Sequence, residues 1–145
     1  MDYQLRPATE EDREWAYRLK RDAYIEVVER QFGPWDETWQ RALFRDRWNP
    51  SISQIVRVAG EDVGIITTEV QQDALVLDEI QLANGWRGRG LGSKLIGALL
   101  DRARAHGKSV KLQVLKENVR AKALYHRLGF DVVDESETHF VMRAG

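Results

Sequence analysis

The spacing of hydrophobic residues switches along the chain between a helical period near 3.6 and strict alternation, and these switches predict an order of elements. That order is β-α-α-β-β-β-α-β-α-β-β. The predicted elements are a strand around Tyr3–Leu5, helices from about Glu10 to Gly33 and from Asp36 towards Trp48, strands Gln54–Ala59, Val63–Val70 and Ala74–Ala83, a helix from Leu91 to Gly107, a strand through Val110, Leu112 and Val114, a helix over Asn118–Gly129, and strands Asp131–Asp134 and His139–Arg143.

Local signals define several ends of these elements. Thr9 and Asp12 resemble a capping pair ahead of the first helix. Pro50 disfavours helical geometry at Asn49, so the second helix is expected to end there. The residues 60–62, Gly-Glu-Asp, join two alternating runs and predict a hairpin.

A glycine-rich segment, Arg87–Ser93, follows an apolar strand and opens an amphipathic helix. Its glycines lack the Cβ atoms that would keep an anion away from the backbone, and a helix N-terminus carries about half a positive charge. The segment therefore predicts a site for a phosphate ester. A glycine-rich turn that only caps the helix is the competing interpretation.

Two familiar phosphate motifs do not fit this segment. A dinucleotide-binding loop needs a third glycine where the chain has Ser93. A P-loop needs Gly-Lys-Ser/Thr at a spacing that Ser93-Lys94-Leu95 does not provide. What remains is the pattern R-x-x-G-x-G, formed by Arg87, Gly90 and Gly92.

A second informative segment, residues 118–130, follows the next strand and forms a helix that ends at Gly129. Asn118, Ala121 and Tyr125 are spaced i, i+3 and i+7, so they share one helix face. A small residue, a polar group and a phenol on one face can line a narrow slot.

The two segments together resemble the GNAT superfamily of N-acyltransferases, through R-x-x-G-x-G and N-x-x-A-x-x-x-Y-x-x-x-G-F. The resemblance implies an α/β (α+β) fold with one mixed, mostly antiparallel, splayed sheet flanked by helices. It also implies acetyl-CoA as co-substrate and CoA contacts from two sets of residues. These are the loop positions Arg87, Gly88, Arg89, Gly90, Leu91, Gly92 and Ser93, and the helix positions Asn118, Ala121 and Tyr125.

One departure from the family pattern precedes the loop. Where the family commonly has V-x-P, this chain has Leu82-Ala83-Asn84. The backbone of Leu82 is still expected to hydrogen-bond the acyl carbonyl and the start of the pantetheine, because such contacts do not depend on the side chain.

Composition narrows the class of protein. With 145 residues, 43% of them hydrophobic, we expect a single domain over 1–145. The chain has no cysteine, so acyl transfer through a cysteine acyl-enzyme is excluded and direct attack is favoured. No apolar run is long enough for a membrane span, and the N-terminus lacks a leader pattern, so we expect a cytoplasmic protein.

Charge is distributed unevenly although the net charge is only −1. Residues 80–127 carry 11 Lys or Arg against 2 acidic residues, whereas residues 1–79 carry 10 basic and 17 acidic side chains. The basic half suits a polyanion such as CoA, and the acidic half could attract a cationic amine or consist of solvated helix faces. Near-neutral net charge argues against nucleic-acid or membrane partners.

The implied reaction is attack of an amine on a thioester, and it needs groups that move protons. Asp78 and Glu79 lie on opposite faces of one strand, so at most one of them points towards the amine, and of the two we favour Glu79 as the base. A solvent-facing or salt-bridged carboxylate is the alternative for either residue. Tyr125 matches the family's tyrosine, which protonates the departing thiolate; a packed tyrosine is the alternative. The three histidines lack metal-ligand spacing, so no metal is expected.

The segment between the first two helices is rich in aromatic residues. Trp35, Trp39 and Glu37 are the candidate acceptor pocket, with cation–π and charge contacts to an amine, although some of these aromatics could simply pack in the core. The prediction is an acetyl-CoA-dependent N-acetyltransferase for a small-molecule or peptide amine. Its alternatives are a protein N-terminal acetyltransferase and a non-catalytic acyl-CoA sensor; homodimerisation through the C-terminal strands stays open.

Overall fold

The structure, a computed structural model, describes residues 2–145 and contains every predicted element in the predicted order. Its helices are α1 (Arg13–Phe32), α2 (Glu37–Arg47), α3 (Leu91–Ala105) and α4 (Val119–Arg127). Its strands are β1 (Gln4–Pro7), β2 (Ser53–Val58), β3 (Glu61–Val70), β4 (Ala74–Leu82), β5 (Ser109–Leu115), β6 (Asp131–Glu135) and β7 (His139–Ala144). Three short 3₁₀ turns, η1 (Glu10–Asp12), η2 (Pro50–Ile52) and η3 (Asn84–Trp86), were not predicted.

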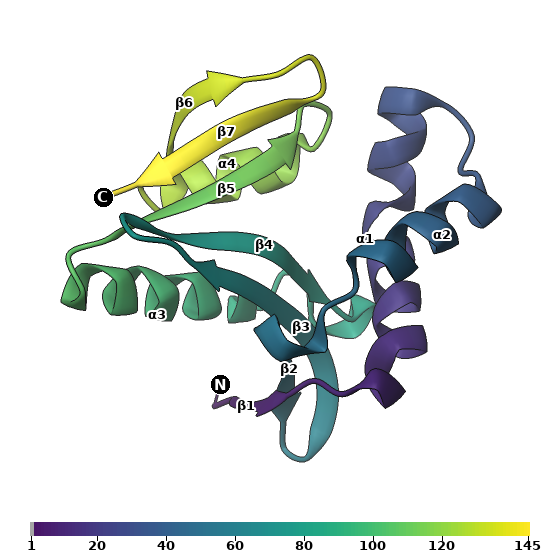
Figure 1. The fold of residues 1–145 in the computed structure, drawn as a ribbon, viewed down its shortest axis with the longest axis horizontal. Coiled ribbons are helices and arrows are strands. Elements are labelled where there is room, and N and C mark those ends of the chain that lie inside the picture. Colours follow the sequence, from purple (N-terminus) through teal and green to yellow (C-terminus); the bar gives the residue numbers. More distant parts are fainter. Residues whose placement is uncertain (1) are drawn as a thin grey trace. The chain divides into compact units, whose positions relative to one another are not determined.

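The strands form one mixed sheet in the order β1-β2-β3-β4-β5-β7-β6 (Figure 1). β4 and β5 are parallel, whereas the pairs β1–β2, β2–β3, β5–β7 and β6–β7 are antiparallel. The parallel pairing covers Ala74–Leu77 against Ser109–Leu112, although both strands continue beyond it. The predicted mixed, mostly antiparallel sheet flanked by helices is confirmed.

Two compact units make up the chain. Unit 1 contains the described residues up to 67 together with 79–87, and unit 2 contains 68–78 and 88–145. The hairpin of β3 and β4 contributes to both. That the whole chain is a single domain stays a prediction.

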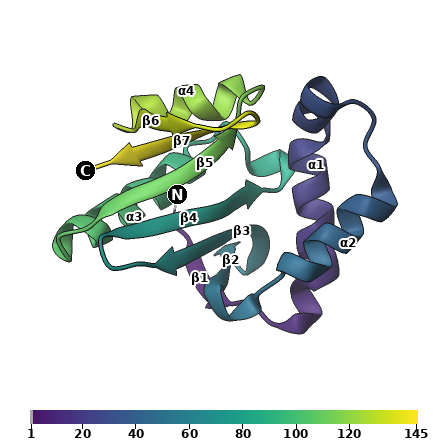
Figure 2. The same ribbon diagram turned by 45° about the horizontal axis from the view of Figure 1, so that its top comes forward.

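Unit 1 packs α1 and α2 side by side (Figures 1 and 2). The rings of Tyr17 and Phe44 meet edge to face at 5.5 Å, and the Arg41 guanidinium lies 4.4 Å from the Tyr17 ring centre. Arg41 also donates to both carboxylate oxygens of Glu14, at 3.0 and 3.1 Å. The core beneath includes the buried residues Ala8, Ala16, Leu19, Ile55 and Ile65.

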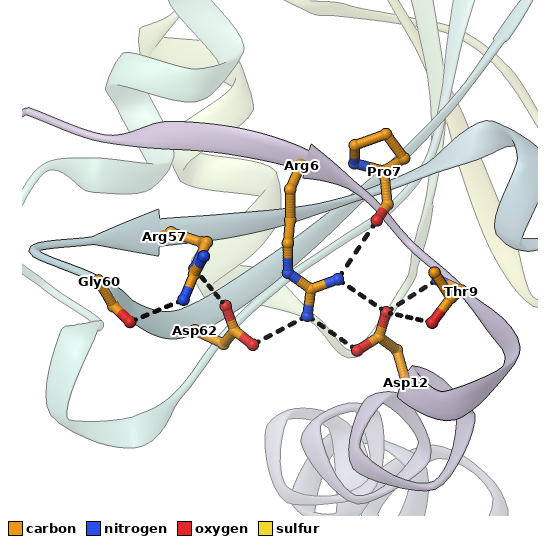
Figure 3. A network of polar contacts seen from close by, with 7 residues as sticks. All are labelled: Arg6, Pro7, Thr9, Asp12, Arg57, Gly60 and Asp62. Atoms are coloured by element: carbon orange, nitrogen blue, oxygen red, sulfur yellow. Dashed lines mark hydrogen bonds and ion pairs between the residues drawn. The ribbon is translucent and has the colours of Figure 1, made fainter.

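A network of charged side chains joins β1, η1, β2 and β3 (Figure 3). Arg6 donates to both oxygens of Asp12 and to Asp62 Oδ2, each at 2.9 Å. Asp62 Oδ1 in turn lies 2.9 Å from Arg57 Nε. Thr9 donates its backbone N–H to Asp12 at 2.8 Å, which confirms the predicted capping pair. The network holds the start of the first helix to the sheet of unit 1.

Unit 2 places α4 along β5, β6 and β7, as Figure 2 shows, and α3 contacts β5. The buried face of α3 consists of Leu91, Leu95, Ile96, Leu99 and Ala103, so the helix is amphipathic as predicted. α3 ends just ahead of Gly107, whose φ of +65° is left-handed. Within residues 2–145, no helix combines the length and apolar composition that crossing a membrane would require.

Candidate functional site

The glycine loop, residues 87–93, turns into α3 through two left-handed glycines. Gly88 has φ of +71° and Gly90, the N-cap of α3, has φ of +83°. Only glycine adopts such backbone angles without strain. A Cβ built on either residue would meet no atom within 4 Å, so the backbone faces open space there. The sequence pattern thus reflects a real backbone requirement, and the loop leaves room for a ligand.

The start of α3 presents several backbone N–H groups. Lys94 donates the first helical hydrogen bond, to the Gly90 carbonyl at 3.1 Å, so the amides of Leu91, Gly92 and Ser93 have no acceptor within the helix. The Leu91 side chain is buried and anchors this turn. No acidic residue lies in the first turn. An anion is favoured here by the helix dipole and by the donors themselves.

Arg87 is held at the entrance of the loop, within unit 1. Its Nε donates to the carbonyl oxygen of Leu82 at 2.9 Å. Its Nη2 is buried and has no hydrogen-bond partner among the described residues. A buried guanidinium N–H without an acceptor costs free energy, and an anionic ligand could supply that acceptor. The arginine and the glycine turn therefore both suit a phosphate-bearing co-substrate.

The predicted residues of α4 lie on one face, as their spacing requires. Asn118 is the N-cap, and its side-chain oxygen accepts from the Ala121 N–H at 3.3 Å. Tyr125 is 8% exposed, and its ring centre lies 5.8 Å from that of Phe130. The cap explains Asn118 structurally without excluding a ligand contact, because the amide NH₂ can still donate.

Glu79 lies near the end of β4 and is already partnered. Lys20 of α1 donates to its Oε1 at 2.6 Å, and Gln81 donates to its Oε2. The side chains of Lys20 and Glu79 are 27% and 31% exposed. Each carboxylate oxygen accepts two hydrogen bonds, so Glu79 can still take one more at each. The pair confirms a salt-bridged carboxylate and leaves its use as a base open to test.

A hollow of about 50 Å³ opens in unit 1 beside Glu79, and we call it the Glu79 hollow. Residues of α1, of the end of α2 and of β2, β3 and β4 line it. The apolar lining consists of Ala16, Phe44, Trp48 and Ile65. The polar lining that matters below consists of Lys20, Arg47, Asn49, Ser53, Thr67 and Glu79.

Trp35, Glu37 and Trp39, the predicted acceptor residues, do not line this hollow. Glu37 accepts from Tyr17 and, at 3.1 Å, from Arg41. The Tyr17 hydrogen bond, helped by Arg21 and Arg41, holds the pKa of Glu37 below its ordinary value. Trp39 is 58% exposed. Their role in acceptor binding stays a prediction.

Gly64 of β3 is a residue that sequence reasoning missed. A Cβ at this position would come within 2.6 Å of the Leu82 side chain and 2.7 Å of the Gln81 carbonyl oxygen. Only glycine therefore lets β3 approach the end of β4, where Leu82 lies. A lone glycine inside an alternating run was the available signal, because such glycines mark close backbone approach.

Lys20 and Arg47 were also missed, since nothing in the sequence links them to Glu79. As for metals, no group of three or more His, Asp or Glu side chains that could hold an ion occurs within residues 2–145.

Several proteins share sequence with half of the chain. A mycothiol acetyltransferase of Corynebacterium glutamicum is 42% identical over 76 residues, which is 50% of this chain and 25% of that protein. A 5-NmdU N-acetyltransferase of Pseudomonas phage PaMx11 is 39% identical over 71 residues, 49% of each chain. The matches thus span a quarter to a half of the relatives' lengths.

Solved structures share the fold along nearly the whole chain. The PaiA N-acetyltransferase of Thermoplasma acidophilum, in complex with coenzyme A, has a TM-score of 0.79 at 16% identity and covers 99% of both chains. The ribosomal-protein-S18-alanine N-acetyltransferase of Escherichia coli has a TM-score of 0.68 at 20% identity, over 99% of this chain and 93% of that one. At these identities the likeness concerns the fold alone.

The model of the acetyltransferase (GNAT) family matches residues 14–130, which include the glycine loop, Glu79 and the face of α4 that carries Tyr125. The chain therefore belongs to the GNAT family of acetyltransferases.

Proposed function

We propose that the chain is an N-acetyltransferase that moves an acetyl group from acetyl-CoA to a primary amine by direct attack. The observation that carries the proposal is the glycine loop, in which two left-handed glycines expose the amides at the start of α3. These amides suit the CoA pyrophosphate. The buried Nη2 of Arg87, which has no hydrogen-bond partner among residues 2–145, suits an anionic ligand as well. Acetyl-CoA, when bound, supplies the reactive thioester.

Leu82 is proposed to polarise the thioester carbonyl through its backbone N–H. The N–H of the next residue, Ala83, donates to Val63 of β3 at 2.8 Å. Because successive residues of a strand direct their N–H groups to opposite sides, the Leu82 N–H is directed away from β3. A donor that is not used within this hairpin supports a role in stabilising a developing oxyanion.

Glu79 and Tyr125 are proposed to move the two protons of the reaction. Presenting a lysine-like amine in its neutral form at pH 7 costs about 4.6 kcal/mol, so a proton acceptor is needed. Glu79 has unused acceptor capacity for the amine proton, directly or through a water. Tyr125 supplies a phenol that can protonate the departing thiolate.

The test is release of CoA thiol from acetyl-CoA across amino acids, polyamines, aminoglycosides and peptides, with Tyr125→Phe as control. We expect turnover on one amine class, and a fall in kcat of about 10²–10⁴-fold in Tyr125→Phe with the Kd for acetyl-CoA kept within about threefold. Turnover on peptide N-termini alone would identify an N-terminal acetyltransferase. Binding of acetyl-CoA without turnover on any amine would support a sensor, and absence of binding would overturn the proposal.

A further inference from the structure

The Glu79 hollow has an excess of one positive charge. Its lining contains two cations, Lys20 and Arg47, and one anion, Glu79. The Lys20–Glu79 ion pair, at 2.6 Å, cancels one charge of each sign. Arg47 is left as the charge that a ligand could neutralise.

The other polar groups of the hollow bind one another. Ser53 Oγ donates to the Asn49 carbonyl at 2.9 Å and lies 2.9 Å from Thr67 Oγ1. Asn49 Oδ1 accepts from the Ser51 hydroxyl at 2.6 Å. The two hydroxyls and the Asn49 side-chain oxygen therefore already have partners within the protein. They line the hollow but offer few free hydrogen-bonding groups to a ligand.

Arg47 differs from them. It is exposed at the last position of α2, and within residues 2–145 its side chain makes no hydrogen bond or ion pair. A guanidinium presents a planar fork of N–H donors that matches a carboxylate. Its place beside an apolar wall of Phe44 and Trp48 lowers the competition from water on that side.

We infer that the acceptor is a small amine that also carries a carboxylate, and that Arg47 binds this carboxylate in the Glu79 hollow. The inference rests on the proposed function, because it takes the surroundings of Glu79 as the acceptor site. A hollow of about 50 Å³ holds a group of carboxylate size, and the rest of the acceptor extends out of it.

The same charges disfavour a polyamine acceptor. A second ammonium group would need a carboxylate whose charge is not already balanced, yet Lys20 pairs with Glu79 at 2.6 Å. The acidic side chains of the N-terminal half are largely engaged elsewhere in unit 1. Asp12 and Asp62 bind Arg6, and Glu14 and Glu37 bind Arg41. The acidic excess therefore does not make this hollow negative.

Attraction to the negative end of the α2 dipole is the alternative reason for a cation at Arg47. Arg45 provides a matched control, because it lies in the same last turn of α2 but does not line the hollow. A dipole effect would act on both arginines, whereas a carboxylate contact would involve Arg47 alone.

The experiment compares amines that differ only by a carboxylate, such as lysine with 1,5-diaminopentane, phenylalanine with phenethylamine, and 4-aminobutyrate with propylamine. Each pair is assayed with the wild-type chain, Arg47→Met and Arg45→Met. Methionine keeps an apolar stem of similar length and removes the charge. Melting curves confirm that both variants fold.

We expect the wild type to favour the carboxylate-bearing member of at least one pair by tenfold or more in kcat/KM. Arg47→Met should reduce that preference to threefold or less, mainly through KM, and Arg45→Met should keep it. Preference for the plain amine in every pair, or an unchanged preference in Arg47→Met, would overturn the inference.

Failure of the proposed function would look different, because no amine of either kind would then be acetylated. In that case calorimetric binding of the same pairs decides the inference. Binding of the carboxylate-bearing amines that weakens tenfold in Arg47→Met would support it, and equal binding by Arg47→Met and the wild type would overturn it.

Discussion

The glycine loop and the Glu79 hollow present ligand-binding groups in different ways. In the loop the groups are backbone amides, placed by Gly88 and Gly90 and by the start of α3. In the hollow they are side chains whose availability depends on pairing between distant elements, as when Lys20 of α1 binds Glu79 of β4. A backbone site can serve many members of a family that use one co-substrate, whereas a side-chain site can change with the acceptor.

Glu79→Gln should have the largest effect that distinguishes the two regions. If Glu79 takes the amine proton, the amide variant loses about 10²–10⁴-fold in kcat/KM, while the Kd for acetyl-CoA stays within about threefold. The measurements are steady-state kinetics and calorimetry. Asp78→Asn is the matched control, since Asp78 is the adjacent carboxylate of β4 on the opposite face. Loss of activity in Asp78→Asn, with Glu79→Gln unaffected, would move the base to Asp78.

Gly90→Val should have the next largest effect, and unlike Glu79→Gln it should act on the binding of acetyl-CoA. A left-handed conformation costs a residue with a side chain about 1–2 kcal/mol, and the valine side chain would occupy the open space beside the loop amides. We expect the Kd for acetyl-CoA to rise about 100-fold, as measured by calorimetry.

Gly97→Ala is the control for Gly90→Val, because Gly97 lies inside α3 without a left-handed φ and has open space around a Cβ. Alanine there should stabilise the helix by up to about 1 kcal/mol and leave binding unchanged. Equal weakening of acetyl-CoA binding by both substitutions would show that the loop has no special role.

The same contrast explains which parts could be predicted from the sequence. The elements followed from hydrophobic periodicity and from punctuation such as Gly129 and Asn49-Pro50, which are local signals. The glycine loop was predictable for the same reason, because left-handed backbone angles favour glycine at those positions. The three 3₁₀ turns escaped prediction, since three residues carry no periodic pattern.

Side-chain partners across long separations could not be predicted. Lys20 and Glu79 are 59 residues apart, and a single sequence does not indicate that they meet. Glu37 illustrates the consequence. As an acidic residue beside tryptophans it suggested an anchor for a cation, but Tyr17 and Arg41 already bind it. Charge counts alone therefore do not indicate what the acidic half binds, because the pairing of its side chains decides which charges are available.

The smallest effect is expected for Asp12→Asn. This substitution tests whether the acidic side chains of unit 1 mainly stabilise the fold. Hydrogen bonds from Arg6, and less so from Thr9, hold the pKa of Asp12 below its ordinary value. A carboxylate with a lowered pKa stabilises the fold above its ordinary pKa, near 4, and loses this contribution as the pH falls towards the lowered value. We expect Asp12→Asn to lower the free energy of unfolding at pH 7 by about 1–2 kcal/mol and to weaken the dependence of that free energy on pH below about 4, as measured by urea denaturation.

Asp46→Asn is the control, because Asp46 is exposed and lies 3.9 Å from Arg45. It should change the free energy of unfolding by no more than about 0.5 kcal/mol at either pH. Unchanged stability of Asp12→Asn together with an altered KM for the amine would show that the Arg6 network takes part in ligand binding. The acidic side chains of unit 1 would then not serve mainly to bind its own basic residues, and the contrast with the glycine loop would fail.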